Sequence, residues 1–104
     1  MKIHKIIIPK GDEAQVDVEI YNHQPEGVYR YIPQEGDALK IELYNANGET
    51  VLTADADLTK PDYVYFNLNT TNLNKGTYTY DVILQTIDEE KPHHVVKGYP
   101  IIIN

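Results

Sequence analysis

Apolar and polar residues alternate along most of the chain, whereas the apolar spacing of an amphipathic helix is almost absent. Val16, Val18 and Ile20, for example, alternate with Asp17 and Glu19. Successive side chains on a β-strand point to opposite faces, so each such segment has one face for a core and one for solvent. This is typical of antiparallel sheets that cover a core on one side. The core positions that the pattern predicts are Val16, Val18, Ile20, Leu39, Ile41, Leu43, Val64, Phe66, Leu68, Tyr80, Val82 and Leu84.

Turn-forming residues separate the alternating segments. Asn47-Gly48 lies between two of them and predicts a type I′ hairpin turn, because both residue types tolerate the positive φ that this turn requires. The strands predicted between such breaks span residues 2–8, 14–22, 28–32, 38–45, 49–55, 62–69, 77–86 and 94–103. The sequence therefore predicts an all-β fold, an immunoglobulin-like antiparallel β-sandwich of about seven strands. Residues 1–104 are expected to form one domain, since the chain is too short for two independent cores.

The stretch "TNLNKGTYTYDVIL" contains a pattern that is typical of a sandwich corner. In a tyrosine corner, a tyrosine entering a late strand donates a hydrogen bond to the connection before it. Here Tyr78 is the corner tyrosine, Leu73 is expected to plug the core, and Gly76 to allow the tight bend. We expect the Tyr78 side chain to be buried, with its hydroxyl bonded to backbone within residues 72–74. The alternative is that Tyr78 is one more aromatic residue of the core.

Two short segments of the chain are nearly identical. "VEIYN" occupies residues 18–22 and "IELYN" residues 41–45, and a Gly-Asp pair precedes each of them. The spacing to that pair differs by two residues between the copies, and no third copy exists, whereas a solenoid needs a fixed period and at least three repeats. We interpret the similarity as two strands that meet the same half-buried packing requirement.

Charge and composition exclude several classes of partner. The net charge is −7 and the nine basic residues are scattered, so no cationic cluster for nucleic acid is present. The N-terminal region has only three consecutive apolar residues before Pro9, too few for a signal peptide or a membrane span. We therefore expect synthesis in the cytoplasm and no membrane insertion. With no cysteine in the chain, stability has to come from packing.

The residue types needed for catalysis or metal binding occur without a suitable arrangement. The chain has neither serine nor cysteine, so the commonest nucleophiles are missing. His93 and His94 are adjacent and follow Pro92, which favours a solvated loop edge over a metal site. Asp55, Asp57 and Asp62 resemble part of a calcium loop, but the central glycine and terminal glutamate are missing. We predict no catalytic, cofactor or metal residues, and a protein that is not an enzyme.

Tyrosine is unusually frequent, with nine residues in the chain. By strand parity Tyr21, Tyr44, Tyr63 and Tyr65 lie opposite the predicted core face. Exposed aromatic residues of this kind are enriched at protein interfaces and on sugar-stacking surfaces, and we treat the four as a candidate interaction surface. The alternative is that each one packs against cross-strand neighbours within its own sheet.

Three segments together resemble a known family. They are "YIPQEGDALKIELYN", "FNLNTTNLNKGTYTYDVILQT" and "VVKGYPIIIN", which contain the stretch 33–37, the corner block 73–81 and a final strand with Gly98. In these features the chain resembles small immunoglobulin-like proteins of phages and prophages of Gram-positive bacteria, similar in fold to the N-terminal domain of phage baseplate upper proteins. The segment "QTIDEEKPHHVVKG" departs from that pattern, because it is longer and more charged than a tight hairpin.

The resemblance implies a non-enzymatic structural or adaptor component of a phage tail or baseplate, associated with the virion. Its partners would be other tail or baseplate proteins or a second copy of itself. The alternative is a carbohydrate-binding module that uses the exposed tyrosines. Because an open sandwich leaves unpaired edge strands, we expect residues 2–8 and 94–103 to be the edges available for docking.

Overall fold

The computed structural model of the protein is built entirely from β-strands in the residues that it describes, namely 6–11, 14–18, 21–30, 33, 35–58, 64–87 and 91–104. This part of the chain contains no helix that could cross a membrane. The strands are β1 (Ile6–Ile8), β2 (Ala14–Val18), β3 (Tyr21–Gln24), β4 (Gly27–Arg30), β5 (Ala38–Tyr44), β6 (Thr50–Asp57), β7 (Val64–Leu68), β8 (Gly76–Gln85) and β9 (His93–Ile103). The all-β prediction is confirmed.

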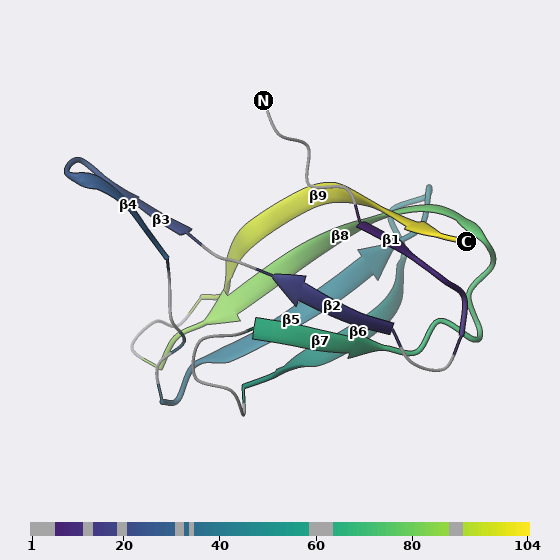
Figure 1. Cartoon of the computed structure of the whole chain (residues 1–104), viewed down its shortest axis with the longest axis horizontal. Coiled ribbons are helices and arrows are strands. Elements are labelled where there is room, and N and C mark those ends of the chain that lie inside the picture. The colour runs from purple at the N-terminus through teal and green to yellow at the C-terminus, as the bar shows by residue number, and fades with distance from the viewer. Residues whose placement is uncertain are drawn as a thin grey trace.

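Seven of the strands form one continuous sheet that folds over on itself (Figure 1), in the order β1-β9-β8-β5-β6-β7-β2. Strand β6 joins the two layers. Its residues up to Asp55 pair with β5, whereas Ala56 and Asp57 pair with β7. All pairings are antiparallel except β1 with β9, which is parallel. The result is a β-sandwich whose layers are connected through one long strand.

The alternation of apolar and polar residues in the sequence corresponds to an alternation of buried and exposed side chains in the strands. Strand β2 reads buried, exposed, buried, exposed, buried from Ala14 to Val18, and β5 buries every second residue from Leu39 to Leu43. All the core positions predicted from the sequence are buried except Ile20, which lies outside the described residues. The core also contains Ile8, Ala14, Ile101 and Ile103, which the pattern did not identify.

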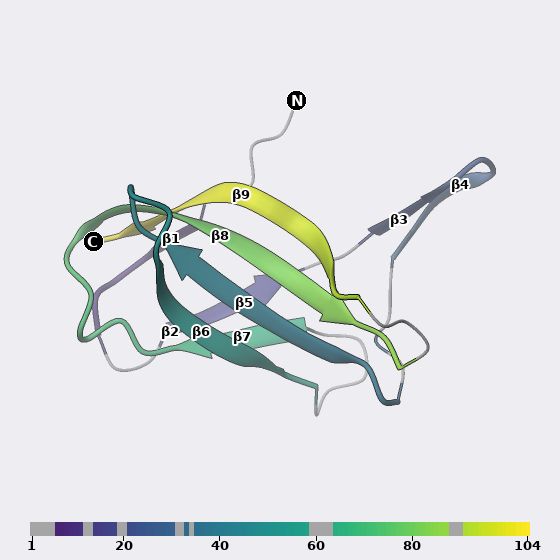
Figure 2. The ribbon, with the colours of Figure 1, turned by 180° about the vertical axis from the view of Figure 1, so that it is seen from behind.

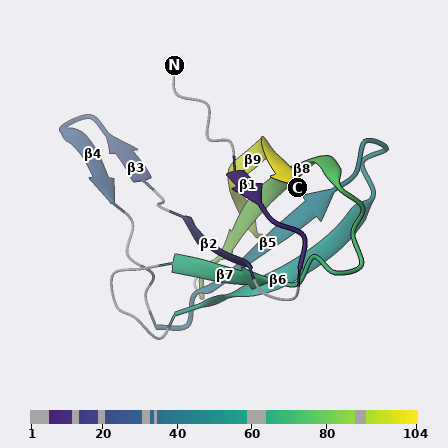
Figure 3. The same ribbon diagram turned by 45° about the vertical axis from the view of Figure 1, so that its right-hand side comes forward.

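The predicted strand 14–22 is wrong in its second half. Strand β2 ends at Val18, where its pairing with Val64 of β7 also ends, and β3 starts a separate hairpin with β4. We call this hairpin, residues 21–30, the arm. It projects from the sandwich in all three views (Figure 1, Figure 2 and Figure 3), and in the described residues β3 and β4 pair only with each other. The segment "VEIYN" therefore bridges two strands, whereas "IELYN" continues β5 up to Tyr44 and then enters a turn.

Of the two segments expected as docking edges, one forms an edge strand of the sheet and the other does not. Strand β1 is the last strand of the sheet, as predicted, although residues 2–5 lie outside the described residues. Strand β9, predicted as the other edge, lies between β1 and β8, because Ile6–Ile8 pair in parallel with Ile101–Ile103. The other terminal strand of the sheet is β2.

The end of the sandwich where β9 finishes is held by specific hydrogen bonds, and we call it the closed end. Thr70 is fully buried there. Its hydroxyl accepts from the Gly11 N–H at 2.9 Å and lies 3.3 Å from the Pro9 carbonyl and 3.2 Å from the Gly11 carbonyl, to either of which it can donate. The Thr70 N–H donates to the Gly11 carbonyl at 2.9 Å. One threonine thus ties the connection after β7 to the connection after β1.

Two further contacts fasten the closed end. The Lys10 N–H donates to the Asn104 carbonyl at 2.8 Å, which anchors the residue after the last strand. In the β5–β6 turn, the Asn45 side-chain oxygen accepts from the N–H groups of Asn47 at 2.9 Å and Glu49 at 3.0 Å. The opposite end, where the arm leaves the sandwich at the left of Figure 1, is called the arm end below.

Candidate functional site

The outer face of the layer formed by β6, β5, β8 and β9 contains two buried residues where strand parity predicts solvent exposure. Leu39, Ile41 and Leu43 of β5 point into the core, so Lys40, Glu42 and Tyr44 point outward. In register with them on β8, Asp81 lies opposite Glu42 and Ile83 opposite Lys40. Asp81 is 7% exposed and Ile83 is 5% exposed. This face therefore has its own packed polar and apolar structure.

Asp81 organises an irregular stretch of β9. Tyr80 pairs with Tyr99 and Val82 with Val96, so Lys97 and Gly98 together lie opposite Asp81. This is a β-bulge, and Gly98 at φ +69° supplies the left-handed conformation that such a bulge can require. One carboxylate oxygen of Asp81 accepts from the Gly98 N–H at 2.8 Å, and the other lies 2.7 Å from His94 Nδ1. The buried Asp81 carboxylate thus contacts β9 at two points, Gly98 within the bulge and His94 before it.

A second polar group lies next to the first, on β5. The Tyr44 hydroxyl donates to Glu42 Oε2 at 2.7 Å, and Lys40 Nζ lies 3.2 Å from Glu42 Oε1. The hydrogen bond from Tyr44, and after it the interaction with Lys40, lowers the pKa of Glu42 despite partial desolvation. Desolvation and the bond to Glu42 raise the pKa of Tyr44. The acidic and basic groups of this strand satisfy one another, and Glu42 is ionised at neutral pH.

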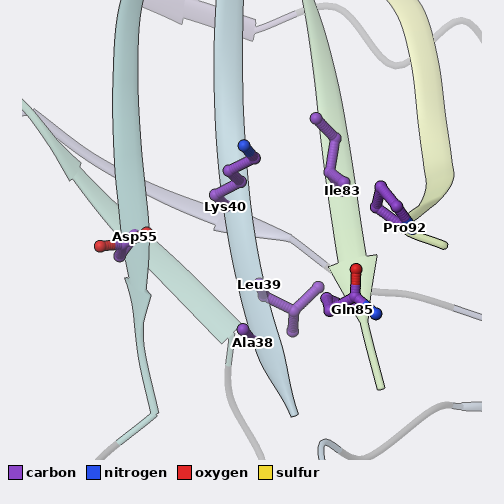
Figure 4. Close-up of a pocket in the computed structure, with 7 residues that line it drawn as sticks. All are labelled: Ala38, Leu39, Lys40, Asp55, Ile83, Gln85 and Pro92. Atoms are coloured by element: carbon purple, nitrogen blue, oxygen red, sulfur yellow. The ribbon is translucent and has the colours of Figure 1, made fainter. Parts of the chain in front are cut away.

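A shallow pocket of about 290 Å³ opens on this face at the arm end (Figure 4). In the close-up, Lys40 and Ile83 extend from neighbouring strands and Pro92 lies beside Ile83. The buried Ile83 side chain supplies apolar surface on this face, whereas Lys40, Asp55 and Gln85 provide polar atoms. The residues that line it are Ala38, Leu39, Lys40, Asp55, Ile83, Gln85 and Pro92. Its size and mixed lining suit the side chain of a partner.

Of the four tyrosines predicted as an interaction surface, the structure describes the side chains of two, Tyr44 and Tyr65, and neither is fully exposed. Tyr44 is half-buried on β5 and bonded to Glu42. Tyr65 is only 9% exposed, contrary to the prediction, because its strand β7 lies between β2 and β6, with Asp17 opposite it on one side and Asp57 on the other. Tyr21 opens the arm, its side chain is outside what the structure describes, and Tyr63 lies outside the described residues altogether.

Tyr78 has the hydrogen bond expected of a tyrosine corner. Its hydroxyl donates to the Asn74 carbonyl at 2.8 Å. Leu73 is half-buried against the core, and its N–H donates to the Thr70 carbonyl at 3.0 Å. Gly76 begins β8 with φ +155°. Tyr78 itself is half-buried, not buried, because its ring covers the edge of the core at the closed end.

The histidine pair was misplaced by the sequence interpretation. Both residues are exposed, as predicted, but they open strand β9 and His94 contacts Asp81. Two signals for this contact exist in the sequence: a glycine inside a long strand, which marks a bulge, and an aspartate between the apolar Tyr80 and Val82. Neither signal gives the register that brings them together.

Two of the three acidic residues considered as part of a calcium loop lie in a strand and not in a loop. Asp55 and Asp57 belong to strand β6, and Asp62 lies outside the described residues. Within the part of the chain that the structure describes, no three potential metal ligands gather.

Comparison with known proteins gives a different relationship from the one that the sequence resemblance suggested. A family model described as a secretion system C-terminal sorting domain matches residues 29–96, from within β4 to within β9. No curated protein matches the chain. The resemblance to phage immunoglobulin-like proteins is therefore wrong, and so are the inferred role in a phage tail or baseplate, the virion location, and the carbohydrate-binding alternative to that role. The quoted motifs misled because Leu73, Gly76 and Tyr78 form a corner that unrelated sandwiches share.

Proposed function

The chain belongs to the family of secretion system C-terminal sorting domains, and we propose that it sorts a cargo protein for export by a bacterial type IX secretion system. The observation that carries this proposal is the family match over residues 29–96. The match includes β5 to β8 entirely, and with them most of the sandwich core. The destination of the cargo in this proposal is the cell surface or the medium.

In this proposal the domain works by being bound, and it catalyses no reaction. The polar groups of the outer face support this, because they are engaged with one another: Asp81 with Gly98 and His94, and Glu42 with Tyr44 and Lys40. Such a network fixes the shape of a surface, which is what recognition by a partner requires. The core that backs this surface keeps it rigid on its inner side.

The test is export of a fused reporter. Residues 1–104 are joined to the C-terminus of a reporter enzyme and produced in a bacterium with a type IX system, and in the same strain with that system inactivated. We expect reporter activity outside the cell only when both the domain and the intact system are present. A reporter without the domain controls for leakage. Retention of the fused reporter inside the intact strain, with the fusion folded and undegraded, would refute the proposed function.

A further inference from the structure

Asn47-Gly48 is the only Asn-Gly pair in the sequence, and it lies in the exposed turn between β5 and β6. In such a pair the backbone nitrogen of the glycine can attack the side-chain carbonyl carbon, Cγ, of the asparagine, because glycine has no side chain to hinder the approach. The surroundings are open, since a Cβ placed on Gly48 would have nothing within 4 Å outside its chain neighbours. Any restraint on the reaction therefore has to come from the turn itself.

The turn supplies such a restraint through Asn45. Its side-chain oxygen accepts from the N–H groups of Asn47 at 2.9 Å and Glu49 at 3.0 Å. Its backbone carbonyl accepts from the Gly48 N–H at 3.0 Å. Three consecutive backbone N–H groups therefore donate to one residue. The middle one, that of Gly48, belongs to the nitrogen that would have to attack Asn47.

A hydrogen-bonded Gly48 nitrogen is a poor nucleophile. The attack needs the electron pair that the nitrogen gains when it loses its proton, and the bond to the Asn45 carbonyl stabilises the protonated form. The bonds from the N–H groups of Asn47 and Glu49 fix the backbone on either side, so the rotation that ring closure requires breaks the turn. The Asn47 side chain is held more weakly, with its Nδ2 3.5 Å from Glu49 Oε1.

We propose that Asn47 is a deamidation site whose rate is set by opening of the β5–β6 turn, and that Asn45 is the residue that keeps this turn closed. In the open turn the Gly48 nitrogen attacks Cγ of Asn47, and its proton passes through water to the departing group. The Cγ–Nδ2 bond breaks, ammonia leaves and a cyclic imide remains. Water then opens the imide to aspartate or isoaspartate. The proposal does not depend on the sorting function, because it concerns the chemistry of this chain alone.

Deamidation should prevent the turn from closing again in its original form. A carboxylate at this position would lie beside Glu49, whose side chain accepts from Asn47 in the structure, so repulsion replaces a hydrogen bond. Isoaspartate also adds an atom to the main chain, and the three N–H groups then no longer reach Asn45 together. Each reacted molecule thus loses part of the closed end.

The test follows deamidation by mass spectrometry at mildly alkaline pH. It compares the purified domain with a synthetic peptide of residues 43–51, which contains the pair without the fold. We expect Asn47 to react about tenfold or more slowly in the domain than in the peptide. Asn45→Ala should remove most of this protection, whereas Asn45→Asp, which keeps the acceptor oxygen, should retain most of it.

Asn69→Ala is the matched control. The Asn69 side-chain oxygen accepts from the Thr71 N–H at 3.1 Å in another exposed turn, so its removal makes the same change away from Asn47. We expect Asn69→Ala to leave the rate at Asn47 unchanged. Thermal unfolding of all variants verifies that they are folded.

Amide exchange keeps the test decisive if Asn45→Ala does not fold. Exchange of the Gly48 N–H and deamidation of Asn47 need the same opening, so the fold should slow both by the same factor relative to the peptide. Equal deamidation rates in the folded domain and in the peptide would overturn the proposal. So would a folded Asn45→Ala variant that reacts no faster than the unaltered domain, or an Asn69→Ala variant that reacts as fast as Asn45→Ala.

Discussion

The two ends of the sandwich are built on different principles. At the closed end Thr70, Tyr78 and Asn45 turn the connections into hydrogen-bonded parts of the fold. At the arm end the apolar side chains of Leu58 and Ile87 are exposed, and a pocket opens on the sheet surface. The hydrogen bonds between side chains and backbone at the closed end serve stability, whereas exposed apolar groups serve recognition at a cost to solubility. Substitutions at the closed end should therefore change stability, and substitutions at the arm end should change recognition.

The largest effect on stability is expected from Thr70→Val at the closed end. Valine keeps the volume but leaves the Gly11 N–H without its acceptor inside the protein, which costs about 1–3 kcal/mol. Thr70→Ser, which retains the hydroxyl, is the control and should lose less. Urea unfolding measures both variants. An unchanged midpoint for Thr70→Val would mean that the closed end is not held by this threonine.

Tyr78→Phe should have the next largest effect. It removes the hydroxyl that donates to Asn74 and keeps the ring, so a loss of about 0.5–1.5 kcal/mol is expected without unfolding of the domain. In thermal unfolding this corresponds to a decrease of several degrees in Tm for a domain of this size. A Tm equal to that of the unaltered protein would show that the corner hydrogen bond contributes nothing.

A smaller effect is expected from pH at Glu42. The pKa of Glu42 in the folded protein is below its ordinary value of 4.5, chiefly because of Tyr44. The ionised carboxylate therefore stabilises the fold above pH 4.5, and this contribution is lost as pH falls through the lowered pKa. Glu42→Gln should be less stable by a few tenths of a kcal/mol at pH 7. Unfolding curves at pH 7 and pH 3 should show this difference shrinking; a constant difference would argue against it.

The smallest effect on stability, and a large one on function, is expected from Ile87→Ser at the arm end. The side chain is mostly exposed, so the free energy of unfolding should change by less than about 0.5 kcal/mol. Export of a fused reporter should nevertheless decrease several-fold. Ile7→Ser, at another exposed isoleucine on β1, is the matched control and should be exported normally. Equal export of the two variants would show that Ile87 is no more important for export than Ile7.

The fold could be predicted because the information for it is local. Alternation in residues 14–18 and 38–44 fixes which side chains enter the core, and Asn47-Gly48 marks a turn. The type I′ geometry predicted for this turn is wrong, because Gly48 has φ +80° but Asn47 does not have positive φ. The arm was missed because alternation continues from Val18 through Tyr21, so the pattern contains no sign that the backbone changes partner.

The site was harder to predict, because it depends on register. His94 and Asp81 are 13 residues apart, and the β8–β9 register that brings them together shifts twice, between Tyr80 and Val82 and between Val82 and Ile83. The burial of Ile83 on the outward face likewise depends on register, which places it between Lys40 of β5 and His94 of β9. The sorting role was missed for a different reason. Corner and turn residues specify a β-sandwich, and proteins with this fold have many different functions.

The most direct test of the sorting role is the amount of reporter enzyme outside the cell when residues 1–104 form its C-terminus. The quantity to measure is the ratio of external activity in a strain with an intact type IX system to that in the same strain with the system inactivated. Our account predicts a ratio well above one. A ratio of one for the unaltered, folded fusion would contradict it.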